Sequence, residues 1–84
     1  MTESYAQMNS YSQLVQALNG ILGSLGNVIG GMALLWSAYT AHINSGNQAE
    51  ANYALQQYRD CERRKEELER KERDLRERIA QCPA

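Results

Sequence analysis

The 84-residue sequence contains no phenylalanine, one proline, one histidine and two cysteines. A chain this short buries only about 60% of its unfolded surface when it folds alone. Without phenylalanine, its core would have to come from scattered leucine, isoleucine and alanine, so an independent globule is not expected. The formal net charge of -1 provides no electrostatic case for specific binding to nucleic acid.

Side chains that perform catalysis or bind metals are equally scarce. His42 lies at the end of an apolar segment, which fits a helix-end or interfacial residue better than a base or ligand. Cys61 and Cys82 form no CxxC motif, and a metal site would require both to converge on His42 from distant helical positions. The glycines lie inside a helical pattern and not after a strand, so no phosphate-binding loop is indicated. We expect no enzyme activity, no cofactor and no metal.

The charged residues are confined to one half of the chain. No formally charged side chain occurs between Glu3 and Glu50, whereas residues 59–78 hold all nine basic residues and eight of the ten acidic ones. Residues 1–9 are polar, are expected to be frayed, and lack the positive charge that begins a signal peptide.

Residues 10–43 are predicted to form an apolar helix. Ser10 and Gln13 have the spacing of a capping box, and bulky side chains recur at helical intervals from Leu14 onward. Small residues recur at intervals of three and four on a largely separate face. This small-residue stripe consists of Gly23, Gly26, Gly30, Ala33 and Ser37.

Five of the six glycines lie within residues 19–39, where each costs roughly 1 kcal/mol relative to alanine in a helix. A contact outside the segment must offset this cost. In a bilayer, small residues let helices approach closely, and Gly26 and Gly30 form the minimal GxxxG motif. We therefore predict that the small-residue stripe packs neighbouring copies in a homo-oligomer.

The segment from Ile21 to Ala41 also has about the length needed to cross a bilayer core of about 30 Å. Trp36 and Tyr39 lie near one end, as interfacial aromatic residues do. Two alternatives remain: a helix buried only among protein subunits, favoured by amides such as Asn19 and Asn27, and a self-contained helical hairpin.

Residues 44–47 are predicted to form a hinge or turn, followed by a charged helix over residues 48–81 and a tail at 82–84. Gly46 fits a left-handed helix end, and Asn47 with Glu50 repeats the capping-box spacing. Acidic and basic residues four apart favour the second helix in solution. The caps are compatible with a folded-back hairpin and with one continuous rod. The fold class is thus all-α.

The charged helix contains an apolar heptad seam, which Lys65 and Glu72 interrupt. The seam predicts either a weak parallel coiled coil or ring of helices, or a solvated helix that packs one narrow stripe against a neighbour. The seam residues are Tyr58, Cys61, Leu68, Leu75 and Ile79.

The order of these segments, from "GNVIGGMALLW" through "INSGNQAEANYALQQ" to "RRKEELERKERDLRER", resembles the small internal virion proteins, or ejection proteins, of short-tailed bacteriophages. The resemblance covers roughly residues 20–80. It implies a protein carried in the virion near the portal or tail proteins, which enters the host envelope after ejection. There it would help to form a conduit for the genome, with the small-residue stripe packing neighbouring helices.

Two other functions compete with this one. A holin-like lysis protein would also have a glycine-bearing transmembrane helix, although its charged tail would normally be more basic. A helical adaptor lining a virion tube or ring would use the same packing surfaces without entering a membrane. Presence in purified particles separates the first and third functions from the second.

Overall fold

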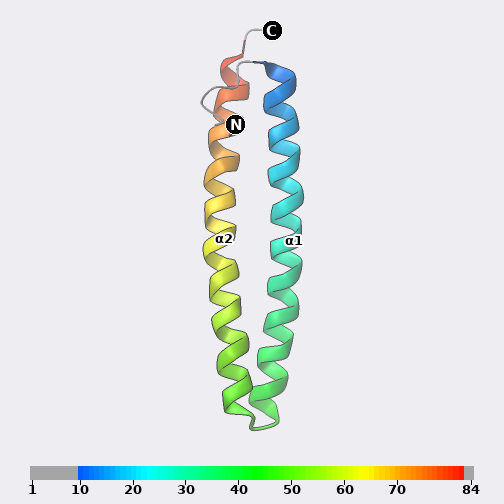
Figure 1. Ribbon diagram of the computed structural model, residues 1–84, viewed down its shortest axis with the longest axis vertical. Helices are drawn as coiled ribbons and strands as arrows, with labels where there is room; N and C mark the ends of the chain where they lie inside the picture. Colours follow the sequence, from blue (N-terminus) through cyan, green and yellow to red (C-terminus); the bar gives the residue numbers. More distant parts are fainter. Residues whose placement is uncertain (1–9, 83–84) are drawn as a thin grey trace, which may run out of the picture.

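The computed structural model describes residues 10–82, and within that range it consists of two helices joined by a tight turn. Helix α1 spans Tyr11–Asn44 and helix α2 spans Gln48–Gln81. They run antiparallel, side by side along their whole length, and form a rod of 58 × 24 × 17 Å (Figure 1). The predicted all-α class, apolar first helix and short break are confirmed. The predicted frayed segment 1–9 and the last two residues of the tail lie outside the described range.

Each helix begins at a side-chain cap that the sequence spacing predicts. The Ser10 hydroxyl accepts a hydrogen bond from the Gln13 backbone N–H at 3.4 Å. The Asn47 side-chain oxygen accepts one from the Glu50 backbone N–H at 3.3 Å. These bonds satisfy donors that the first turn of a helix leaves without partners.

The turn between the helices is closed by the backbone of residues 45–47. Gly46 has a φ of +77°, the left-handed conformation that favours glycine. Its N–H donates to the Ile43 carbonyl at 3.1 Å, and the Asn47 N–H donates to the His42 carbonyl at 2.8 Å. This pair of bonds is a Schellman motif, which ends α1 and reverses the chain. The structure therefore adopts the hairpin and not the continuous rod.

The core lies between the helices and is largest at the end farthest from the turn. Leu14 and Leu75 are almost completely buried there, with exposed fractions of 1% and 0%. Ala51 and Ala54 are the buried residues of α2 closest to the turn, where small side chains allow the helices to approach. The main apolar cluster comprises Leu14, Ile21, Leu25, Leu68 and Leu75.

Candidate assembly and membrane-facing surface

The small-residue stripe lies on the part of α1 that α2 does not cover. All five of its residues are exposed. A Cβ atom built on Gly23, Gly26 or Gly30 meets no atom within 4 Å. The glycines are therefore not required for contact between α1 and α2, and their cost to the helix is not offset inside the hairpin.

Large apolar side chains extend this uncovered surface. Leu34 is 74% exposed, and Ile29 and Trp36 are each 50% exposed. From Gly26 to Asn44, no residue of α1 is fully buried. Large exposed apolar surfaces mark sites where a protein meets another protein or a membrane.

Helix α1 is long and apolar enough to cross a bilayer. Its 34 residues correspond to about 51 Å at about 1.5 Å per residue, which exceeds a hydrocarbon core of about 30 Å. Only 11% of its most apolar window is buried inside the hairpin. The core helix of a soluble protein would instead be mostly buried, so α1 differs from such a helix.

The two predicted membrane-interface residues take part in an aromatic cluster near the turn. The Trp36 ring lies 5.2 Å from the Tyr39 ring and 5.3 Å from the Tyr58 ring, measured between centroids. Tyr58 comes from α2, so one side of Trp36 contacts the hairpin partner while the rest is exposed. The Trp36–Tyr58 contact also shows the register of the two helices, with residue 36 of α1 beside residue 58 of α2.

The seam residues of α2 lie along its contact with α1. Leu68 and Leu75 are buried, and Tyr58, Cys61 and Ile79 are partly buried. Another copy cannot occupy this seam while α1 covers it. Both cysteines are free thiols, and Cys82 packs at the edge of the apolar cluster.

The two charged residues that interrupt the seam each form an ion pair within α2. The Lys65 ammonium lies 3.0 Å from the Glu69 carboxylate, and the Glu72 carboxylate lies 2.8 Å from the Arg76 guanidinium. Glu69 also lies four residues before Arg73, but in the structure it pairs with Lys65. Because these side chains are partly exposed, each pair contributes about 1 kcal/mol or less.

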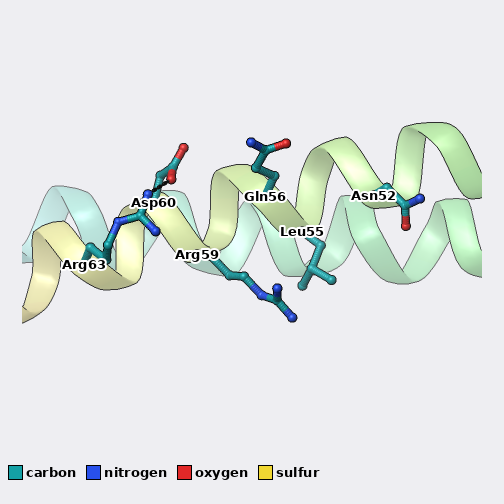
Figure 2. Close-up of a pocket in the computed structure, with 6 residues that line it drawn as sticks. All are labelled: Asn52, Leu55, Gln56, Arg59, Asp60 and Arg63. Atoms are coloured by element: carbon teal, nitrogen blue, oxygen red, sulfur yellow. Dashed lines mark hydrogen bonds and ion pairs between the residues drawn. The ribbon is translucent and has the colours of Figure 1, made fainter.

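The outer side of α2 carries a shallow polar groove, lined from one helix alone. Figure 2 shows its six side chains, all from α2, with the Arg63–Asp60 ion pair marked. Asn52, Leu55, Gln56 and Arg59 complete the lining. No group of three or more His, Cys, Asp or Glu side chains that could hold a metal occurs in residues 10–82.

His42 lies at the end of α1, where its backbone carbonyl accepts bonds from the turn. The Ser45 hydroxyl donates to this carbonyl at 3.1 Å, in addition to the Asn47 N–H. Through these two bonds, the His42 carbonyl helps to close the turn.

Comparison of the chain with protein-family models, curated proteins and solved structures finds no match. On one side, the hairpin presents an uncharged helix with an open small-residue stripe, and on the other a helix with basic and acidic residues interleaved.

Proposed function

We propose that this chain is a non-enzymatic assembly protein that associates through the outer face of α1 and acts at a membrane. The main support for this proposal is that α2 leaves most of the apolar surface of α1 exposed. The helix has no formally charged side chain, its most apolar window is 11% buried, and a Cβ atom built on any of its five glycines meets no atom within 4 Å.

These features support a membrane and a second copy as the surroundings of α1. Lipid provides the apolar environment for Ile29 and Leu34, while α1 helices of other copies pack against the small-residue stripe. The exposed backbone and the amides of Gln16, Asn19 and Asn27 gain partners in such an assembly. The charged outer face of α2 stays in water.

The resemblance to ejection proteins of short-tailed bacteriophages makes the role specific. In that role, copies of this chain travel in the virion and assemble in the host envelope as part of a genome conduit. The near balance of basic and acidic residues on α2 favours this role over a holin-like protein with a strongly basic tail.

A pair of leucine substitutions tests the assembly claim. Gly26→Leu with Gly30→Leu should abolish oligomers in detergent, because side chains on the small-residue stripe would hold the helices apart. Helicity measured by circular dichroism should not fall. The size of the oligomer would be measured by light scattering coupled to size-exclusion chromatography.

Gly20→Leu with Gly31→Leu is the matched control. These glycines belong to the same helix and lie outside the stripe, and a Cβ atom at either of them meets nothing within 4 Å. The control should retain the oligomers. Oligomers of equal size in both double variants would contradict assembly through the stripe, and the absence of any oligomer in the native protein would contradict the proposal as a whole.

A further inference from the structure

We propose that the hairpin opens at residues 45–47 when α1 enters a bilayer, so that the membrane form is extended and the hairpin is its closed form in water. This inference rests on the proposed membrane function. It concerns the segment that would span the bilayer, Ile21 to Ala41, and the part of α2 that lies beside it.

The register of the hairpin places charged residues beside most of that span, including its middle. Because Trp36 contacts Tyr58 and the helices are antiparallel, residues 21–41 lie beside residues 53–73. Thirteen of those twenty-one residues of α2 are charged, from Arg59 to Arg73. The charges therefore lie level with the middle of the span and with its Ile21 end, while residues 53–58, beside the Ala41 end, are uncharged.

The linings of two grooves, one on each flank of α1, agree with this placement. On one flank, Lys65 lines a groove together with Ile29, Met32 and Trp36. On the other, Arg64 lines a groove with Asn27 and Gly31. Ile29 to Met32 occupy the middle of the candidate span, so a closed hairpin that entered the bilayer would carry these cations to its centre.

Charged side chains at the centre of a bilayer are costly, and long ones reach the headgroups only from positions near a helix end. Lys65 and Arg64 have no such route in a closed, inserted hairpin. If α2 separates from α1, the apolar helix can cross the bilayer without them. The charged helix then stays in water.

The break between the helices is suited to this separation. It consists of residues 45–47, with Gly46 in the left-handed conformation. Each helix has its own first-turn cap, from Ser10 and from Asn47. Changes of φ and ψ in the break, with loss of the Asn47–His42 backbone bond, can therefore swing α2 away while both helices stay formed.

Opening also gives the α2 seam a new role. Leu68 and Leu75 belong to the apolar cluster in the closed form, and they lose the cover of α1 when α1 enters lipid. The seam is then free to pair with α2 of another copy. Opening thus links insertion of α1 to association of α2.

A reducible tether between the helices tests the proposal. Asn27→Cys and Arg64→Cys place two exposed thiols in one groove. The native cysteines are removed by Cys61→Ser and Cys82→Ser. A short bismaleimide that contains a cleavable disulfide then bridges the two new thiols. Insertion is followed with a tryptophan at mid-span, from Ile29→Trp in a Trp36→Phe background. The probe is quenching by acyl-chain-brominated lipids in vesicles of phosphatidylethanolamine and phosphatidylglycerol.

The matched control uses the same linker between Gln57→Cys and Arg64→Cys, which are two turns apart on α2 and leave the hinge free. We expect deep quenching in the control, none in the tethered hairpin, and at least tenfold recovery of the quenching signal after the linker is cleaved. Equal quenching before and after cleavage would overturn the opening. No quenching in either protein after cleavage would instead refute the membrane function on which the inference rests.

Discussion

Replacing two glycines of the small-residue stripe with alanine should make the isolated hairpin more stable. Gly26 and Gly30 lie in the interior of α1, and a Cβ atom at either position meets nothing within 4 Å. The added methyl groups therefore create no clash, while the conformational freedom lost on folding is reduced. Each substitution should raise the free energy of unfolding by about 0.8–1 kcal/mol, and the pair by about 2 kcal/mol.

Gly46→Ala is the matched control, because it makes the same chemical change where φ is +77°. Placing an L side chain in the left-handed region should lower the free energy of unfolding by about 1–2 kcal/mol. The three proteins would be compared by urea denaturation followed by circular dichroism, at a concentration where each is monomeric. A double variant less stable than the parent would show that Gly26 and Gly30 are needed for packing inside the hairpin, which is the opposite of what the open space around them predicts.

The remaining predictions concern the core, the cap of α2 and an ion pair within α2, and all are read from urea denaturation. Leu75→Ala should lower the free energy of unfolding by about 2–5 kcal/mol, whereas Leu34→Ala, at a 74% exposed position, should change it by about 0.5 kcal/mol or less; equal effects would contradict the hairpin. Asn47→Ala should cost about 1 kcal/mol through the lost cap, and Asn47→Asp should retain most of the stability; an Asp variant as unstable as the Ala variant would argue against the cap. Arg76→Gln removes the 2.8 Å contact with Glu72 and should cost about 1 kcal/mol or less; a loss as large as that of Leu75→Ala would show that this pair is a main support of the fold.

The two helices and their ends could be predicted from the sequence because the signals are local. Ser10, Gly46 and Asn47 act on backbone groups within a few residues, and the structure shows each of them in the predicted place. The division of α1 into bulky and small faces also follows from spacing alone. The bulky residues at the far end meet α2, and the small-residue stripe stays outside this contact.

The choice between a hairpin and a rod could not be made from the same signals. The caps at the break satisfy the helix ends in both geometries, so the decision depends on packing between residues far apart in the sequence. Leu14 with Leu75, and Trp36 with Tyr58, make that packing. The heptad seam indicates an apolar partner for α2, but its spacing does not say whether the partner belongs to the same chain.

The ion pairs show the same limit on a smaller scale. Glu69 lies four residues from both Lys65 and Arg73, and the acid-first order that stabilises helix pairs favours Arg73. Glu69 instead pairs with Lys65, which lies on the side of α2 that faces α1. The pairs Glu67–Lys71 and Asp74–Arg78 form at the spacing that the sequence offers.

The distance between residues 27 and 64 reports directly whether the hairpin opens when α1 enters a bilayer. Spin labels on Asn27→Cys and Arg64→Cys, in a chain without the native cysteines, report this distance by electron paramagnetic resonance in buffer and in vesicles. In the closed hairpin both residues line one groove. If α1 enters the bilayer and α2 swings away, each label lies about 27 Å from the hinge, so their separation should be about 40–55 Å.

We predict a short distance in buffer and this long distance in vesicles. A short distance in both, with α1 quenched by acyl-chain bromines, would contradict the account, because the charged helix would then have entered the bilayer beside the apolar one.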